Sequence, residues 1–268
     1  MTKIKVCCPA KINLSLKILN KRNDGFHNIE SVMQAINLFD FLTICCSKAQ
    51  SNEIVLNGTS DEIPYNEKNL VYNAATLFFE SCPNIEPIKT EIFIEKNIPV
   101  AAGLAGGSTD AAGTLLGLNE IFERPLNKTQ LHNLCAQLGS DLNFCLDGGC
   151  QKATGRGEIL EKLPFKNFSI SLIKPKNIGI SAGFAYKKFA EKFVTDMNER
   201  KNFVNDLEWA IIDEFEELKK IKNKYPNSIM SGSGSTFYLI NDKFEQEENF
   251  LIKNDLKAID SGIEIIFL

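Results

Sequence analysis

Apolar and polar side chains alternate along much of the first hundred residues, which is the pattern of half-buried β-strands. The alternation is visible in residues 3–9, in "KINLSLKIL" at residues 11–19, in residues 28–46 and in "IKTEIFIEK" at residues 88–96. A turn-forming segment, "NKRNDG" at residues 20–25, separates the second of these strands from the third. The first third of the chain therefore predicts a sheet.

Helical spacing of apolar residues dominates much of the remaining chain, with shorter strands between the helices. We predict helices over residues 69–80, 108–122, 128–138, 181–192, 205–223 and 243–256. We predict further strands near residues 150–154 and 168–173, on both sides of the glycine turn in "SIMSGSGSTFYLI" at residues 228–240, and at residues 263–268. This order predicts a mixed α/β protein of two unequal lobes. Four glycines between residues 148 and 157 suggest a boundary near residue 160, which gives domains 1–160 and 161–268.

One segment, "VAAGLAGGSTDAAG" at residues 100–113, has almost no side-chain bulk before a predicted helix. Ser108 or Thr109 is expected to cap this helix, with Asp110 in its first turn. Backbone amides at a helix N-terminus then form a cradle for an anion, and phosphate is the usual one. The segment is not a P-loop, because Gly107 stands where that motif requires lysine. The alternative is a tight turn whose small residues only allow close packing.

Two further segments carry polar side chains that could perform chemistry. Lys11 and Asn13 project from the same side of the strand at residues 11–19, on the order of 7 Å apart. Asp141 lies in "LGSDLNF", where it could cap a following helix or, beside Lys11, accept or orient a hydroxyl proton. Sequence spacing alone leaves both possibilities open for Asp141, and the strand by itself favours a solvated polar face as the explanation of Lys11 and Asn13.

Composition narrows the class of protein. The 268 residues have 44% hydrophobic and 24% charged side chains and a formal net charge of −4, so no overall basic field would attract nucleic acid or an anionic membrane. No apolar run reaches the roughly 20 residues of a membrane-spanning helix. The eight cysteines form no C-x-x-C motif, and the N-terminus lacks the apolar region of a secretion signal. We therefore expect a soluble cytoplasmic protein with reduced thiols.

Taken together, these segments resemble the GHMP kinase superfamily, whose members carry a P-A-K-[IV]-N-L strand, a G-L-G-G-G-S-S loop and a late G-x-G turn. The corresponding segments occur in family order and cover nearly the whole chain: "CPAKINLSLKILNKRNDGFHNIESVMQAINLFD", "IPVAAGLAGGSTDAAGTLLGLN", "LGSDLNF", "ATGRGEILEKLP", "NDLE" and "SGSGSTF". The resemblance implies a two-lobed α/β fold, with an N-terminal lobe like domain 2 of ribosomal protein S5 and a ferredoxin-like C-terminal lobe. ATP and an alcohol substrate would meet between them.

The D-G-F-H segment is similar to that of family members that phosphorylate the 2-hydroxyl of 4-diphosphocytidyl-2-C-methyl-D-erythritol in non-mevalonate isoprenoid biosynthesis. Under this resemblance Asp141 is the catalytic carboxylate, which also contacts the substrate, and Lys11 is its charge partner. Substrate-binding residues would be Asn13, Phe26 and His27, with Tyr186 on the opposite face of the cytosine ring. ATP would be bound by Asn69 on the adenosine side and by the loop residues Pro99, Val100, Ala101, Ala102, Gly103, Leu104, Ala105, Gly106, Gly107, Ser108 and Thr109.

The resemblance also implies Mg²⁺, for which the sequence offers no dedicated cage beyond Ser108 as a candidate contact, and it leaves monomer and homodimer open. Four positions depart from the family pattern: Ala105 for glycine, Asn143 for proline, Phe26 for tyrosine and Ala182 for threonine. A kinase of homoserine, mevalonate or a sugar, and a catalytically silent nucleotide-binding protein, are the alternatives.

Overall fold

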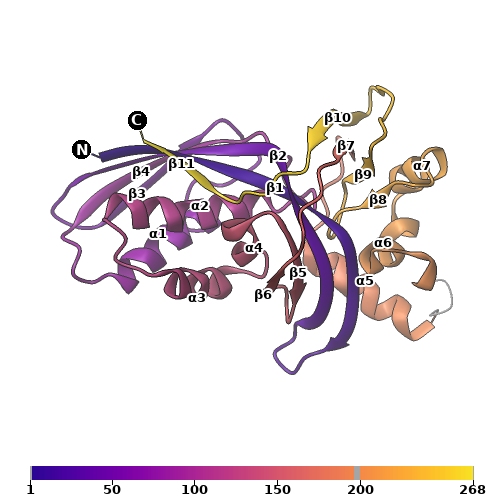
Figure 1. Ribbon diagram of the computed structural model, residues 1–268, viewed down its shortest axis with the longest axis horizontal. Coiled ribbons are helices and arrows are strands. Elements are labelled where there is room, and N and C mark those ends of the chain that lie inside the picture. Colours follow the sequence, from indigo (N-terminus) through magenta and orange to yellow (C-terminus); the bar gives the residue numbers. More distant parts are fainter. Residues whose placement is uncertain (1, 196–199, 268) are drawn as a thin grey trace.

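The computed structural model describes residues 2–195 and 200–267, and in this part of the chain the helices and strands form two lobes, each built on its own sheet (Figure 1). The strands of the first sheet are β1 (Thr2–Lys21), β2 (His27–Lys48), β3 (Glu53–Gly58), β4 (Ile88–Glu95), β5 (Cys150–Thr154), β6 (Ile159–Lys162) and β11 (Glu264–Phe267). The strands of the second sheet are β7 (Ser169–Pro175), β8 (Ile229–Met230), β9 (Phe237–Ile240) and β10 (Phe250–Lys257). The predicted α/β fold is therefore confirmed.

The helices divide between the two lobes. Those of the first lobe are α1 (Leu70–Ser81), α2 (Gly106–Ile121), α3 (Lys128–Leu138) and α4 (Leu142–Asp147). Those of the second lobe are α5 (Ala182–Thr195), α6 (Asp206–Ile211) and α7 (Glu216–Lys224), with single 3₁₀ turns at Arg200–Asn202 and Ile212–Glu214. In the described residues, no helix is both long and apolar enough to cross a membrane.

The long strand β1 connects the hydrophobic cores of the two lobes. Near its start, Ile4 and Val6 pack in the core of the first lobe, under α1 and α2. Near its end, Leu16 and Ile18 pack in the core of the second lobe, together with Trp209. Between them Ile12 belongs to a third cluster that includes side chains of the glycine-rich loop and of β9. Lys11 and Asn13 consequently lie where the two lobes meet, on a strand held from both sides.

The order of strands in the first sheet is β11-β1-β2-β4-β3, and β5 and β6 extend it from β2. The strands at 3–9 and 11–19 are one strand in the structure, with irregular pairing to β2 between Pro9 and Ala10 and between Asn13 and Ser15. Strand β6 belongs to the first sheet and β7 to the second, while β11 returns to pair with β1. The boundary at residue 160 stays a prediction.

Some predicted elements differ from the structure. The helix predicted over 243–256 is wrong, because β10 occupies that segment and pairs with β7. The helix predicted over 205–223 is interrupted at Phe215, whose backbone is extended, so that α6 and α7 are separate. Helix α4 and strands β3 and β6 were not predicted, and Leu268, at the end of the last predicted strand, lies outside the described residues.

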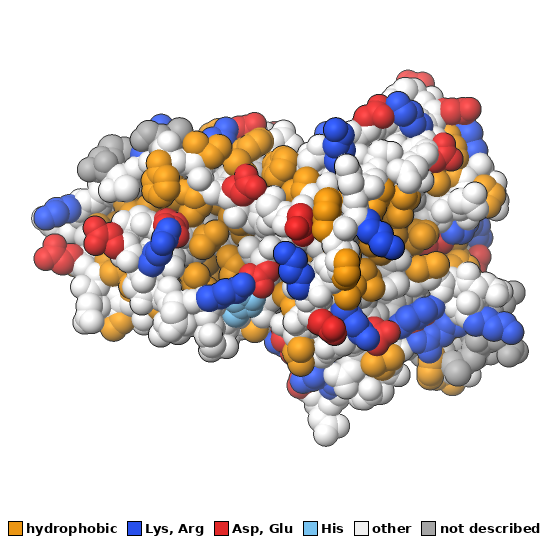
Figure 2. All heavy atoms as spheres, in the orientation of Figure 1, with side chains coloured by type: hydrophobic (Ala, Val, Ile, Leu, Met, Phe, Trp, Pro, Cys, Tyr) orange, Lys and Arg blue, Asp and Glu red, His pale blue; other side chains and the backbone are white. Residues whose placement is uncertain are grey.

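The structure shows how charged side chains are distributed on one face (Figure 2) and where the cysteines lie. Acidic and basic side chains are interspersed on the face seen in Figure 2, with apolar side chains between them. All eight cysteines are free, and six of them are buried. Burial raises the pKa of the Cys8 thiol well above its ordinary value, with the nearby carboxylates of Asp110 and Asp40 adding to the shift. This thiol is therefore protonated at neutral pH.

Candidate active site

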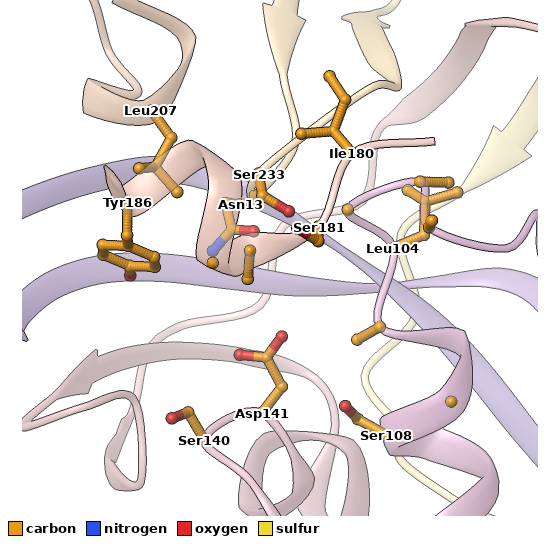
Figure 3. A pocket seen from close by; sticks show the side chains of 18 of the residues that line it. Asn13, Leu104, Ser108, Ser140, Asp141, Ile180, Ser181, Tyr186, Leu207 and Ser233 are labelled. Atoms are coloured by element: carbon orange, nitrogen blue, oxygen red, sulfur yellow. The ribbon is translucent and has the colours of Figure 1, made fainter. Parts of the chain in front are cut away.

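A cleft of about 1130 Å³ lies between the lobes, and nearly all of the predicted site residues line it. Its walls come from β1, from the glycine-rich loop and the start of α2, from the segment before α4, and from the start of α5. Figure 3 shows Asp141 and Ser108 on one side of this space and Asn13, Ser181 and Tyr186 on the other. Of the residues predicted for the site, Thr109 alone does not line the cleft.

Lys11 and Asp141 meet inside the cleft. The Lys11 ammonium lies 3.4 Å from Asp141 Oδ2, donates to Asn13 Oδ1 at 2.6 Å and donates to the carbonyl of Gly103 at 3.2 Å. Asn13 in turn donates from Nδ2 to Ser31 Oγ at 2.8 Å. Lys11 and Asn13 are almost fully buried, whereas about a third of the Asp141 side chain is exposed to the cleft. The arrangement orients a charged lysine toward one accessible carboxylate.

The carboxylate of Asp141 is free of the alternative role that the sequence left open. Asp141 occupies the N-cap position of α4, but its side chain makes no capping hydrogen bond. Next to it, Asn143 replaces the proline of the family pattern and donates from Nδ2 to the carbonyl of Glu158 at 3.0 Å. This hydrogen bond connects the start of α4 to the residue that precedes β6, and a proline could not form it.

The glycine-rich loop directs its carbonyl groups into the protein. The carbonyl of Ala101 accepts from the amide of Ile180, and the carbonyl of Ala102 accepts from the amide of Thr236. The carbonyl of Gly103 accepts from the Lys11 ammonium and from the Ser231 hydroxyl. The carbonyl of Leu104 accepts from the amide of Lys11. Among the described contacts, no amide of residues 101–108 donates to another protein group. These unused amides and the N-terminus of the 16-residue helix α2 form an anion-binding surface along the cleft.

Two predictions about this loop were wrong in detail. Helix α2 begins at Gly106 and its N-cap is Ala105, so neither Ser108 nor Thr109 caps it. Thr109 is fully buried and its amide donates to the carbonyl of Ala105 at 2.9 Å, which removes it from any direct contact in the cleft. Ala105 has φ +59°, so this position adopts the left-handed backbone that glycine favours, although the glycine of the family pattern is absent.

The residues predicted to bind the cytidine end lie together at one end of the cleft. Phe26 is 49% exposed, and the Arg156 guanidinium lies 4.9 Å from the centre of its ring. His27 and Tyr186 are stacked on each other, with ring centres 5.2 Å apart and planes 15° apart. Burial lowers the pKa of His27, assisted by the charge of Lys21, so that its imidazole is neutral at pH 7 and able to donate one hydrogen bond and accept another.

Asn69, predicted on the adenosine side, and Ala182, which departs from the family pattern, also line the cleft. Asn69 caps α1, accepting from the amide of Val71 at 2.9 Å and donating to the carbonyl of Pro64 at 2.7 Å. Its side chain is thus already hydrogen-bonded at the edge of the cleft. Ala182, at the start of α5, presents only a methyl group where the family pattern has a hydroxyl.

Sequence reasoning missed a buried charge cluster that lies under the loop. Lys96, at the end of β4, pairs with Asp40 and with Asp110 Oδ2 at 2.8 Å, and all three side chains are almost fully buried. Burial lowers the pKa of Lys96, but the two carboxylates more than offset this and hold it above its ordinary value. The three residues are far apart in the sequence, and no local pattern connects them. Arg156 was missed as well, although it lies inside the quoted segment "ATGRGEILEKLP".

This chain is similar to a protein-family model and to individual proteins of known name. Residues 69–149 match the model for the GHMP kinases N terminal domain. A 4-diphosphocytidyl-2-C-methyl-D-erythritol kinase of Prochlorococcus marinus (strain NATL2A) is 42% identical over 82% of this chain and 71% of its own length. The kinase of the same name from Syntrophomonas wolfei is 39% identical over 91% of this chain and 90% of its own.

A solved structure extends the comparison to the fold. The crystal structure of a 4-(cytidine 5'-diphospho)-2C-methyl-D-erythritol kinase superposes with a TM-score of 0.67 at 29% identity, and the match covers 87% of this chain and 88% of the other. The lobes, the cleft and the glycine-rich loop described above are those of a small-molecule kinase. This chain belongs to the 4-diphosphocytidyl-2-C-methyl-D-erythritol kinase family of the GHMP kinases.

Proposed function

We propose that this chain transfers the γ-phosphoryl group of ATP to the 2-hydroxyl of 4-diphosphocytidyl-2-C-methyl-D-erythritol, giving the 2-phosphate and ADP in the cytoplasm. The observation that carries the proposal is the Lys11–Asp141 pair, 3.4 Å apart, in the same cleft as the unused amides of the glycine-rich loop. A carboxylate suited to a hydroxyl and a backbone surface suited to phosphates are the two parts that phosphoryl transfer to an alcohol needs.

In this mechanism Asp141 accepts or orients the proton of the attacking 2-hydroxyl. The Lys11 ammonium, 3.4 Å from Asp141 Oδ2, would contact the same hydroxyl. Asn13 and the carbonyl of Gly103 hold the ammonium at 2.6 and 3.2 Å, so it does not need to reorganise when the substrate binds. Phosphoryl transfer depends mainly on such positioning and on charge neutralisation.

The amides of residues 101–108 and the start of α2 would bind the phosphates of ATP. Developing negative charge on the transferred group is stabilised by these fixed dipoles, which are already oriented before the reaction. In the described residues no group of three or more acidic, histidine or cysteine side chains forms a metal cage. Mg²⁺ dehydrates reluctantly and is usually held by phosphates, water and one or two protein oxygens, and the Ser108 hydroxyl lines the cleft at the first turn of α2. Ser108 would supply a protein oxygen, and the ion would neutralise phosphate charge.

The cytidine end of the substrate would bind at Phe26, His27 and Tyr186. The exposed Phe26 ring offers a stacking surface, and the neutral His27 can bond to a base edge that carries both donors and acceptors. Phenylalanine in place of tyrosine keeps the stacking surface and lacks one hydroxyl. Tyr186 would cover the opposite face of the base.

Phosphorus NMR of the protein with MgATP and the cytidylyl substrate tests this function. We expect a new phosphomonoester resonance together with ADP, and Asp141→Asn should bind ATP normally while its turnover falls by roughly 10²- to 10⁴-fold. Homoserine and mevalonate serve as control alcohols. Phosphorylation of a control alcohol instead would change the proposed substrate, and ATP binding without any product would indicate a silent nucleotide-binding protein.

A further inference from the structure

The segment "NDLE" at residues 205–208 belongs to the second lobe, and no residue of it takes part in the mechanism above. We propose that Asn205 is a positioning residue that acts on Lys11 through Gly232. This inference rests on the proposed function, because it assigns to Lys11 the role given there. Three sets of contacts carry it.

First, Asn205 fixes the loop between β8 and β9. Its side chain is completely buried, and Nδ2 donates to the carbonyls of Met230 at 2.7 Å and Gly232 at 2.8 Å. Its Oδ1 accepts from the amide of Leu207 at 2.9 Å and so caps α6. Both N–H donors of the Asn205 side chain therefore bond to the loop, and one of the two acceptor positions of Oδ1 bonds to α6.

Second, the open side of Gly232 faces the catalytic lysine. A Cβ atom added to Gly232 would lie 3.2 Å from Lys11 Nζ, 3.3 Å from Asn13 Oδ1 and 3.0 Å from the carbonyl oxygen of Gly103. Any side chain at position 232 would therefore crowd the ammonium that the mechanism requires, and the φ of +55° suits glycine. If this loop moved away, the Lys11 ammonium would no longer be confined on this side and could leave its position.

Third, the same segment anchors β1 from the other side. Asp206 Oδ2 accepts from the amide of Ile18 at 2.7 Å, and Oδ1 pairs with Lys17 at 3.2 Å. Glu208 Oε2 accepts from the amide of Met230 at 2.9 Å. The four-residue segment therefore holds both the strand that carries Lys11 and the loop that covers it. Among these contacts, those of Asn205 and Glu208 reach the loop, and only Asn205 reaches Gly232.

Asn205→Ser separates the positioning role from the capping role. Serine can still accept from the amide of Leu207, so α6 keeps its cap, but serine cannot supply two N–H donors to two carbonyls. We expect kcat to fall at least tenfold, with the KM values for ATP and for the cytidylyl substrate within about threefold of wild type. Asn119→Ala is the matched control, because Asn119 is a buried asparagine of the first lobe whose side chain, in the described contacts, bonds to the backbone of Leu126. It should lose stability and keep kcat.

A double-mutant cycle with Lys11→Ala shows whether Asn205 acts through Lys11. We expect Asn205→Ser to change the residual kcat less than twofold in the Lys11→Ala background, since the group it positions is gone. A further tenfold loss there, or an unchanged kcat in the single variant, would overturn the inference. If Asn205→Ser does not fold, Gly232→Ala decides instead: it must lower kcat in the wild-type background and not in the Lys11→Ala background. Wild-type turnover of the cytidylyl substrate is measured in the same experiment, so failure of the proposed function is seen separately.

Discussion

Gly103→Ala tests whether the glycine-rich loop is held by backbone contacts with the second lobe. Gly103 has φ +73°, and an added Cβ would lie 2.0 Å from the carbonyl oxygen of Ser231 and 3.0 Å from the amide nitrogen of Gly234. Real Cβ contacts do not fall below 3.0 Å, so the two backbones must separate by about 1 Å. Both contacting atoms are backbone atoms, and no side-chain rotation can relieve the overlap.

The cost follows from the bonds that this separation breaks. Ser231 Oγ donates to the carbonyl of Gly103 at 2.9 Å and accepts from the amide of Asn13 at 3.3 Å. Two such bonds contribute about 1 kcal/mol each, and a left-handed alanine costs about 1 kcal/mol more. We expect the free energy of unfolding in urea to fall by about 3 kcal/mol. Because the loop amides move with Gly103, the Kd for ATP measured by calorimetry should rise at least tenfold.

Gly107→Ala is the control for this substitution. A Cβ on Gly107 meets no protein atom within 4 Å, and the residue lies in the first turn of α2 without a positive φ. Its stability should match or slightly exceed that of the wild type, because alanine favours the helix. If Gly103→Ala were as stable as Gly107→Ala and bound ATP as tightly as the wild type, the loop would not depend on its contact with Ser231.

Three further predictions concern the buried charge cluster and the cytidine end of the cleft. Burial raises the pKa of Asp110 from 3.8 to about 7. Between these pH values the folded protein keeps a proton that the unfolded chain releases. The stabilisation that this gives is fully present below about pH 4 and is lost as the pH rises through about 7. Asp110→Asn should remove this pH dependence. The unfolding free energy of the variant minus that of the wild type, measured in urea, should therefore increase by about 2–3 kcal/mol between pH 5 and pH 8. A difference that stays constant over this range would contradict the raised pKa of Asp110. Lys96→Met leaves Asp40 and Asp110 buried without a cation and should cost about 3–5 kcal/mol in the same assay at pH 8, whereas a loss below 1 kcal/mol would mean that the pair is not buried in solution. Phe26→Ala should raise the KM for the cytidylyl substrate about tenfold and leave the Tm and the KM for ATP unchanged, because the half-exposed ring stabilises a stacked base and not the fold; an equal rise in both KM values would argue against stacking.

The local sequence patterns predict most of this fold because most of its elements obey local rules. Strand alternation identified β1, β2 and β4, and helical spacing identified α1, α2 and α3 within a few residues. The segment at 243–256 failed because its glutamate, glutamine, lysine and leucine residues favour a helix, while β10 forms by pairing with β7. Such pairing depends on a strand 75 to 88 positions earlier in the chain, and tertiary context overrides weak local propensity.

Site residues that form one continuous segment were also predictable from the sequence, whereas those brought together from distant segments were not. The glycine-rich loop was recognisable because binding an anion with backbone amides requires small side chains in one continuous segment. Lys11 and Asp141 are 130 positions apart, and only the resemblance to a family connected them before the structure brought them to 3.4 Å. Lys96 with its two carboxylates, and Arg156 beside Phe26, were missed because each contact joins different elements.

The long strand β1 explains why the reactive groups lie between the lobes and not within one of them. Its start is fixed by the core of the first lobe and its end by the core of the second, so the middle of the strand cannot move without disturbing one of the two. Lys11 is further enclosed by Gly103 from the first lobe and by Gly232 from the second. A residue that both lobes must hold is correctly oriented only when the lobes are correctly packed. Changes at the lobe interface that leave the contacts of the glycine-rich loop intact, such as Asn205→Ser, should therefore reduce kcat before they reduce ATP binding.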